Sequence, residues 1–257
     1  GRTVLVDAPD GPSVSYTYDV SDRLVGVTYG TATTVLQYDL GGRKLAMDDP
    51  DMGDWSYTYD ALGNLLSQVD GRGCTTTLTY DLLSRPTGKS YSGSCGVSTA
   101  AVTYTYDQGT NGAGRRTRLD DGSGYTTWSY DARGRAEYET QVISGSGTFL
   151  TQYAYNSADL PVWMRYPADN TGAQGETVSY TYNTQMLLDR VYGTDTYVDD
   201  TWYDAAGRVT LRELGNNYTL GQTYTYYPWT QQGGRLQSLQ SGIALDTDSL
   251  QSLSYNY

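Results

Sequence analysis

Histidine is absent from this chain of 257 residues, and its absence excludes several kinds of catalytic site. Without an imidazole the chain cannot build a Ser-His-Asp or Cys-His nucleophile system, nor hold zinc through histidine. Aspartate and glutamate are plentiful, at 29 together, so composition alone leaves open a carboxylate pair of the kind that glycosidases use. Carboxylates are therefore the most plentiful groups on which an enzymatic interpretation of the sequence could depend.

Basic residues are also scarce. There are 17 Lys and Arg residues, the net charge is −12, and the isoelectric point is about 4.3. Binding to nucleic acid or to an anionic membrane surface needs clustered Lys and Arg. No apolar run approaches the ~18 residues that a membrane-spanning helix requires. We expect neither a nucleic-acid partner nor membrane insertion.

Phenylalanine is nearly missing: the chain has 1 Phe against 27 Tyr and 5 Trp. An ordinary dry core uses Phe, because a buried phenol hydroxyl must find a hydrogen-bond partner. The bias predicts an aromatic surface with wet or hydrogen-bonded hydroxyls, as in the lining of a cavity or an interface. No long stretch shows apolar residues at helical spacing, whereas 30 Gly residues separate segments rich in Thr, Tyr and Val. The sequence therefore predicts an all-β fold.

The pair Tyr-Asp recurs along the chain at intervals of roughly 20 to 27 residues, which is the signature of a repeat protein. An aromatic or apolar residue usually stands two positions before the pair, so two rings of one strand share a face. The copies are Tyr18-Asp19, Tyr38-Asp39, Tyr59-Asp60, Tyr80-Asp81, Tyr106-Asp107, Tyr130-Asp131 and Tyr203-Asp204, with variants at Tyr155-Asn156, Tyr182-Asn183 and Tyr226-Tyr227.

A short turn follows each pair and most often ends in Gly-Arg or a relative of it. Examples are Gly42-Arg43, Gly63-Asn64, Gly134-Arg135 and Gly207-Arg208. The Asp side chain bonds the backbone two residues on, and the Gly supplies a positive φ, so each unit is predicted to be a β-hairpin. Because a lone hairpin is marginal in water, about ten of them are expected to stack side by side into one curved or spiralling antiparallel sheet.

The motif Y-x-Y-D-x-x-G-R-L resembles the YD or RHS repeat, and the resemblance covers essentially the whole chain. It is carried by residues 57–65 and by Tyr130-Asp131-Ala132-Arg133-Gly134-Arg135. The resemblance implies a sheet that spirals into a hollow shell. In bacterial polymorphic toxins and insecticidal toxin complexes such shells enclose a toxic polypeptide, and in teneurins a similar barrel belongs to a cell-adhesion ectodomain. The units at Asn156 and Asn183 lack Gly-Arg, which puts their turn geometry in doubt.

Both ends of the chain resemble the inside of a hairpin. The start, Gly1-Arg2, resembles Gly207-Arg208, and the last residues, Tyr255-Asn256-Tyr257, resemble the strand before a Tyr-Asp pair. We therefore expect residues 1–257 to be a single array that is a segment of a longer chain. Its expected partners are the rest of that array or identical neighbouring subunits.

The only two cysteines, Cys74 and Cys95, flank the hairpin that follows Tyr80. If Tyr80 faces Gly88, the cysteines fall within about one residue of register at the open end of the hairpin. A disulfide there would close a loop of ~20 residues, worth ~3 kcal/mol in the chain-entropy model. Two unrelated thiols are the main alternative, and metal binding or catalysis is a minor one. The disulfide interpretation implies an extracellular or periplasmic setting, and we expect the protein to be secreted or on the cell surface.

Other candidate sites are weaker. The acidic segment 48–54 and the residues Asp195, Asp199 and Asp200 carry carboxylates but lack the ligand order of a calcium loop. We expect no metal, no cofactor and no catalytic residue, since most aspartates recur with the period of the fold. The sequence thus predicts a non-enzymatic scaffold that encloses a toxin or other cargo polypeptide. The alternative is an extracellular adhesion or filament-forming protein, with carbohydrate binding through exposed aromatics less favoured.

Overall fold

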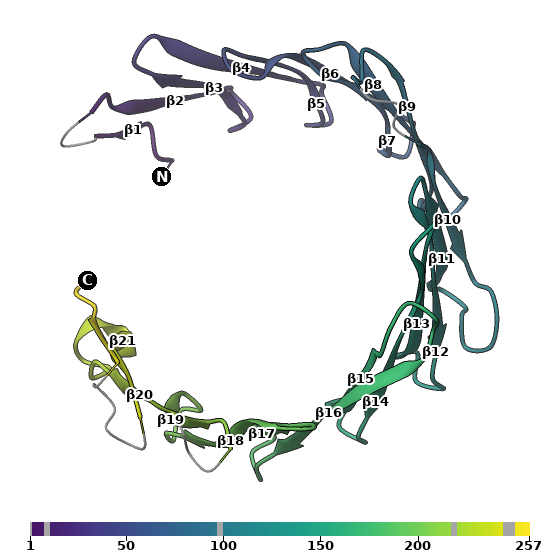
Figure 1. Ribbon diagram of the computed structural model, residues 1–257. Helices are drawn as coiled ribbons and strands as arrows, with labels where there is room; N and C mark the ends of the chain where they lie inside the picture. The colour runs from purple at the N-terminus through teal and green to yellow at the C-terminus, as the bar shows by residue number, and fades with distance from the viewer. Residues whose placement is uncertain (1, 8–10, 97–99, 217–219, 244–249) are drawn as a thin grey trace. The chain divides into compact units, whose positions relative to one another are not determined.

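The computed structural model describes residues 2–7, 11–96, 100–216, 220–243 and 250–257. Gly1, on which the comparison of the chain's start with Gly207 depends, lies outside these ranges. Within them the structure consists of 22 β-strands and a short 3₁₀ turn, η1 (Gln232–Gly234), which confirms the predicted all-β fold (Figure 1). None of the described helical residues forms a segment long and apolar enough to span a membrane.

The chain divides into two compact units. The first comprises Gly1–Gln108 and Ala113–Tyr125. Its strands are β1 (Leu5–Val6), β2 (Val14–Tyr18), β3 (Leu24–Tyr29), β4 (Ala32–Tyr38), β5 (Lys44–Asp49), β6 (Gly53–Tyr59), β7 (Leu65–Val69), β8 (Cys74–Tyr80), β9 (Pro86–Gly93), β10 (Val102–Tyr106) and β11 (Arg116–Asp121).

The second unit comprises Gly109–Gly112 and Thr126–Tyr257. It contains η1 and most of β12 (Gly124–Tyr130). Its further strands are β13 (Ala136–Ile143), β14 (Gly147–Tyr155), β15 (Pro161–Pro167), β16 (Gln174–Tyr182), β17 (Leu188–Tyr192), β18 (Thr196–Tyr203), β19 (Val209–Leu214), β20 (Leu220–Tyr226), β21 (Leu236–Gly242) and β22 (Gln251–Ser254).

Each strand pairs antiparallel with the next strand in sequence, from β1 to β11 in the first unit and from β13 to β22 in the second. Within each unit the layer bends gradually from strand to strand (Figure 1). All Tyr-Asp turns of a unit therefore lie at one edge of its sheet, which we call the signature edge. The remaining connections lie at the opposite edge.

The register shifts by one residue at the Tyr of nearly every pair. In β6 and β7, Thr58 faces Ser67, but Tyr59 faces Leu65. Such a β-bulge locally increases the twist of the strands and re-aims the side chain at its site. The same shift at Tyr80 corrects the register assumed for the cysteines: Tyr80 faces Pro86, and it is Thr79 that faces Gly88.

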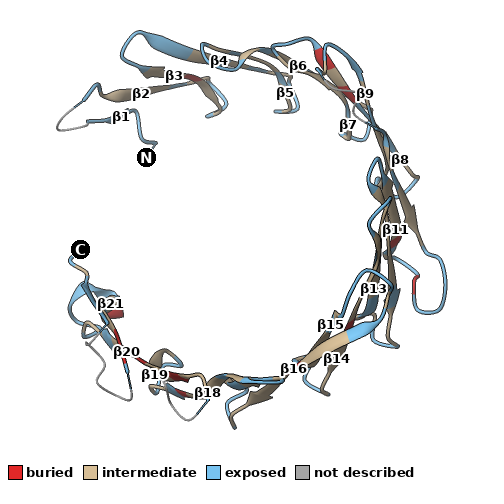
Figure 2. Cartoon of the chain, viewed as in Figure 1, coloured by how far each residue is buried: buried red, intermediate tan, exposed pale blue. Residues whose placement is uncertain are grey.

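Neither unit has a conventional core, because the strands form one layer and most residues stay partly exposed (Figure 2). Among the described residues, the buried hydrophobic side chains are those of Cys74 and Val178, and none is less than 2% exposed. At the signature edge of the first unit, Val20, Leu40 and Leu82 each follow the Asp of a turn and are fully exposed.

Candidate functional site: the repeat lock

The Asp of the signature closes its turn with its own carboxylate. In the turn between β4 and β5, the Asp39 amide donates to the Arg43 carbonyl at 2.9 Å, and the Gly42 amide donates to the Asp39 carbonyl at 3.1 Å. The Asp39 carboxylate accepts hydrogen bonds from the Arg43 amide at 2.9 Å and from Arg43 Nε at 2.6 Å. Gly42 has a φ of 82°, which suits glycine. The pattern repeats at Asp19, Asp81, Asp131 and Asp204.

These hydrogen bonds hold the turn carboxylates in their charged form. The Arg43 backbone amide is the main cause that lowers the pKa of Asp39, and the Arg43 guanidinium adds to it. The pKa of Asp204 is lowered in the same way by the amide and side chain of Arg208. A carboxylate that is ionised and engaged in this way is suited to holding a turn and unsuited to proton transfer.

The two Asn turns keep the same geometry, although they lack Gly-Arg. The Asn156 amide donates to the Leu160 carbonyl at 2.9 Å, and Asn156 Oδ1 accepts hydrogen bonds from the amides of Ala158 and Leu160. Asn183 does the same one repeat later. The doubt about these turns is thus removed, because the amide oxygen of Asn replaces the carboxylate of Asp.

In seven of the ten pairs the Tyr hydroxyl ties its hairpin to the preceding one. The Tyr59 hydroxyl donates to the Lys44 carbonyl at 2.8 Å, where Lys44 follows the turn of the previous repeat. The equivalent hydrogen bonds run from Tyr18 to Thr3, Tyr80 to Leu65, Tyr106 to Pro86, Tyr182 to Pro161, Tyr203 to Leu188 and Tyr226 to Val209. The hydroxyls of these tyrosines therefore bond to backbone carbonyls, and this use of the phenol explains the excess of Tyr over Phe.

The Arg of each turn reaches forward to the next repeat. Arg43 Nη1 donates to the Asp60 carbonyl at 3.0 Å, and its guanidinium lies 5.1 Å from the centroid of the Tyr59 ring. The same two contacts, with a carbonyl of the next turn and with the ring of the next signature Tyr, are made by Arg23, Arg135 and Arg208. Arg85 differs, because it bonds the carboxylate of Asp107 while it lies over the Tyr106 ring.

We call this set, the turn Asp, its Arg and the next Tyr, the repeat lock. The sequence analysis did not predict the forward contact of the Arg. Its sequence signal is the recurrent order in which each turn Arg precedes the next signature Tyr. Where the lock is complete, as at Arg43 and Tyr59, side chains join a hairpin to its neighbour in addition to the hydrogen bonds of the sheet.

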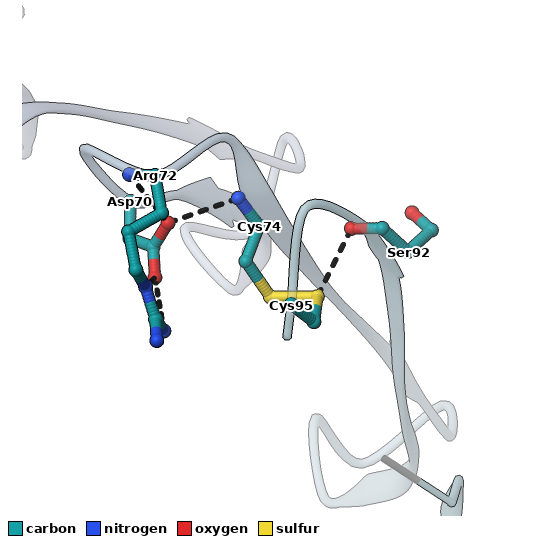
Figure 3. The surroundings of a disulfide bond; sticks show 5 residues. All are labelled: Asp70, Arg72, Cys74, Ser92 and Cys95. Carbon is teal, nitrogen blue, oxygen red and sulfur yellow. Dashed lines mark hydrogen bonds and ion pairs between the residues drawn. A yellow bond between two sulfur atoms is a disulfide. The ribbon is translucent and has the colours of Figure 1, made fainter. Parts of the chain in front are cut away.

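The two cysteines form a disulfide at the opposite edge, with Sγ atoms 1.99 Å apart and Cα atoms 4.5 Å apart (Figure 3). Cys74 faces Gly93, so Cys95 lies two residues beyond the register position of Cys74. The Cys95 amide donates to the Gly93 carbonyl at 2.9 Å, and this tight turn brings Cys95 back to Cys74.

A turn that the sequence analysis missed adjoins the disulfide. The Asp70 amide donates to the Cys74 carbonyl at 3.0 Å, and the Asp70 carboxylate accepts hydrogen bonds from the Cys74 amide and the Arg72 side chain (Figure 3). This is the hydrogen-bond pattern of the signature turn, placed at the opposite edge. Its sequence signal is Asp-Gly-Arg-Gly at residues 70–73. The residue before this Asp is Val69, where a signature turn has Tyr.

The acidic segment 48–54 forms the turn between β5 and β6. The Asp49 carboxylate accepts hydrogen bonds from the amides of Asp51 and Met52 and from Thr34 Oγ1. Asp199 forms an ion pair with Arg190, and Asp195 accepts a hydrogen bond from Asn216. Across the described ranges, no group of three or more acidic or cysteine side chains is placed to hold a metal ion.

A row of carboxylates crosses β17 to β19, of which the sequence analysis named Asp199 and Asp200 but not Asp189 or Glu213. Asp200 faces Glu213, which is 6% exposed. Burial, with the charges of Asp200 and Asp199, raises the pKa of Glu213. Burial and the neighbouring Asp200 carboxyl likewise raise the pKa of Asp189. These residues lack the repeat period, and only the pairing of the strands brings them together.

Comparison with known proteins identifies the repeat. A sequence model of the RHS repeat matches residues 59–94, which hold the turns after β6 and β8. No curated protein matches the sequence. The crystal structure of TcdB2-TccC3-TEV matches 98% of this chain with a TM-score of 0.76 and 19% identity. A Tc holotoxin pore from Photorhabdus luminescens, with a mutation in TccC3, matches 96% with a TM-score of 0.77 and 20% identity.

The chain spans only 14% and 13% of the length of those two solved chains. At this identity the likeness establishes the fold alone. The sequence model shows an RHS repeat at residues 59–94, and the fold that surrounds this repeat is similar to that of the two Tc toxin structures.

Proposed function

We propose that this chain is a stretch of wall in an RHS-repeat shell, a scaffold without catalytic activity that encloses a cargo polypeptide. The observation that carries the proposal is the repeat lock, which joins hairpin to hairpin at the signature edge through backbone carbonyls and rings. A single layer fixed in this way suits a barrier, because its rigidity comes from the lateral contacts of neighbours and not from a core.

The chemistry of the recurrent residues supports a structural role. The signature carboxylates bond turn amides and, in most turns, a guanidinium, and their pKa values are lowered. A catalytic pair would occur once, whereas this arrangement occurs at nearly every hairpin. We therefore assign no catalytic residue.

The proposed partners are further repeats of the same array and an enclosed polypeptide. The chain spans 14% of a matched Tc toxin chain, which supports the view that a larger array surrounds it. By analogy with those Tc structures, the proposed cargo is a toxin polypeptide and the proposed setting is extracellular. The disulfide agrees with that setting, because such bonds persist in oxidising compartments.

The test is electron microscopy combined with limited proteolysis of the complete natural protein. We expect a hollow particle and a polypeptide segment outside the repeats that resists protease while the wall is intact. Chaotrope concentrations that open the wall should make that segment cleavable. A periodic filament, or a non-repeat segment cleaved as fast as an exposed tail in the native particle, would contradict enclosure and favour the adhesion or filament alternative.

A further inference from the structure

A small cavity opens on the sheet of the second unit, across β15 to β18. Its volume is about 330 Å³. Three tyrosines, two valines and one carboxylate line it: Tyr166, Glu176, Val178, Tyr180, Val191 and Tyr197. None of these residues belongs to the repeat lock, although Tyr180 stands two positions before the signature Tyr182.

The strand pairing explains why these side chains share a face. Val178 faces Met164, and Tyr180 faces Val191. Glu176, Val178 and Tyr180 alternate along β16, so all three point to one side of the sheet. Val178 is 7% exposed and forms the floor. Tyr166 and Tyr197 are each 42% exposed, so their rings stand at the opening.

Glu176 supplies a fixed negative charge at this cavity. Its Oε1 accepts hydrogen bonds from the Tyr197 hydroxyl and from the Thr194 amide, each at 2.7 Å. The Tyr197 hydrogen bond is the main cause that lowers the pKa of Glu176, so the carboxylate is ionised at neutral pH. The same bond raises the pKa of Tyr197 to about 12, which keeps its phenol protonated.

The rings of this cavity differ from about half of the other described tyrosines, over which a cation lies. Elsewhere Arg43 lies over Tyr59, Lys89 over Tyr91 and Arg118 over Tyr125, at 5.1, 4.9 and 3.9 Å from the ring centroids. No Lys or Arg in the described part of the chain lies over Tyr166, Tyr180 or Tyr197. The cavity thus combines uncovered aromatic faces, an apolar floor and a carboxylate.

We propose that this cavity binds a quaternary ammonium group. Aromatic faces attract such a cation through the ring quadrupole, and its methyl groups pack against apolar side chains without needing hydrogen bonds. The Glu176 carboxylate supplies the counter-charge, and the net charge of −12 disfavours an anionic ligand. The inference does not depend on the wall function, because a cation site and a barrier are compatible and are tested separately.

The first test compares two ligands of equal shape on the full chain. Choline and its neutral isostere, 3,3-dimethyl-1-butanol, are titrated separately and followed by calorimetry or by the NMR signals of the tyrosine rings. We expect choline to bind at least about tenfold more tightly, since only choline gains the cation–π and carboxylate interactions. Equal affinities, or no choline binding up to about 100 mM, would overturn the proposal.

Variants then assign the binding to this cavity. Tyr166→Leu removes an exposed ring, and Glu176→Gln removes the charge but keeps an acceptor for Tyr197; each should weaken choline binding several-fold. Tyr166→Phe keeps the ring and should retain binding. Tyr138→Leu, in β13 of the same unit and also partly exposed, is the matched control. Unchanged affinity in both Tyr166→Leu and Glu176→Gln, with the fold verified by circular dichroism, would refute the site.

The same cation occurs in a free small molecule, in a phosphocholine headgroup and in a trimethylated lysine side chain. Titration with soluble phosphocholine and with a trimethyllysine peptide distinguishes these sources. Because the cavity already carries a carboxylate, we expect the phosphate of phosphocholine to weaken binding relative to choline. Binding of phosphocholine that exceeds that of choline and survives Glu176→Gln would contradict the electrostatic argument.

Discussion

At the residue scale, the Arg and Tyr side chains of the signature make the contacts that join one hairpin to another. Arg43 bonds its own turn carboxylate, bonds a carbonyl of the next turn and lies over a ring of the next hairpin. Such side chains are sensitive probes, because one substitution removes a contact between hairpins without changing the strand in which it sits. Two predictions follow from these contacts.

Tyr59→Phe is expected to destabilise the first unit by about 1 kcal/mol, because the Lys44 carbonyl loses its phenol donor. The control is Tyr57→Phe in the same strand. Its ring interacts with the Lys44 ammonium, which Phe preserves, and no hydrogen bond from its hydroxyl is present in the described structure. The measurement is equilibrium unfolding by urea. Equal losses of unfolding free energy in the two variants would show that the hydrogen bond from the Tyr59 hydroxyl does not stabilise the unit.

Asn64 occupies the position that Arg holds in other repeats, so it offers a gain-of-contact test. Asn64→Arg should add a cation over Tyr80 and a donor to the next turn, and stabilise the unit by roughly 0.5–1 kcal/mol. Arg43→Asn should destabilise the unit by about the same amount, because it makes this turn like the next one, in which Asn64 replaces the Arg. Thermal unfolding of both variants checks the pair. Shifts of the same sign in the two proteins would be inconsistent with the lock.

At the element scale, the signature hairpin depends on one left-handed residue in its turn. Gly fills that position in several repeats, but Ser84, Asp159 and Met186 also hold it, with φ of 59°, 64° and 62°. A residue with a Cβ in this conformation costs about 1 kcal/mol relative to glycine. The hairpins tolerate that cost because Asp or Asn bonds fix the rest of the turn.

Met186→Gly should therefore raise stability by about 1 kcal/mol, since the Met186 side chain is 60% exposed and little contact is lost. Gly207→Ala, at a φ of 76° in the equivalent position, should lower stability by a similar amount. Chemical denaturation of the two variants measures both effects. A loss of stability in Met186→Gly would show that its side chain packs more firmly than its exposure indicates.

The disulfide acts on the β8–β9 hairpin. Closing a loop over a sequence separation of 21 residues should contribute about 3 kcal/mol, chiefly by restricting the unfolded chain. Reduction should lower the melting temperature, and hydrogen exchange should rise mainly in β8, β9 and the Asp70 turn. The double variant Cys74→Ser, Cys95→Ser should be insensitive to reductant. Mass spectrometry checks the bond in the natural protein. Alkylation of both Cys74 and Cys95 in protein that has not been reduced would refute the disulfide.

At the scale of the whole molecule, acid should unfold the array, because its recurrent carboxylates have lowered pKa values. A lowered folded pKa gives stability that is present above the unfolded value, near 3.8, and is lost as the pH falls through the folded value. The melting temperature should therefore decline as the pH is lowered from 5 to below 3. A melting temperature that stays constant over this range would contradict the ionised turns.

Glu213 should show the opposite pH dependence. Its raised folded pKa gives stability that is present below the unfolded value, near 4.5, and is lost as the pH rises through the folded value. Glu213→Gln should consequently raise the melting temperature at pH 7 and have a smaller effect at pH 4. Glu139→Gln, at a carboxylate outside this acidic row, serves as the comparison. A Glu213→Gln effect that is independent of pH would rule out this titration.

Much of this architecture could be predicted from the sequence, because the turn residues recur in phase with the strands. The all-β fold and the hairpin phase follow from the Tyr-Asp spacing alone. The turns at Asn156 and Asn183 lack Gly-Arg and so are not marked as signature turns by that dipeptide, whereas the oxygen of the Asx side chain is what closes the turn.

Other features depend on the register, which the sequence did not specify. The forward contact of Arg43 and the distance of Cys95 from Cys74 both depend on bulges that shift the pairing by a residue. The cavity at Tyr197 lies beside another irregularity, between Val191 and Tyr192. Such shifts come from local twist and turn closure, and no residue type marks them uniquely.

The single-layer construction has a consequence for how such proteins diverge. In a packed interior, shortening a side chain leaves an empty space that neighbours fill poorly, and this penalty slows sequence change. Here no described side chain is less than 2% exposed, so a shortened residue leaves a hollow that water can enter. Most strand positions should then drift freely, while the residues that close the turns persist. A shared fold at 19% identity is the outcome that this freedom allows.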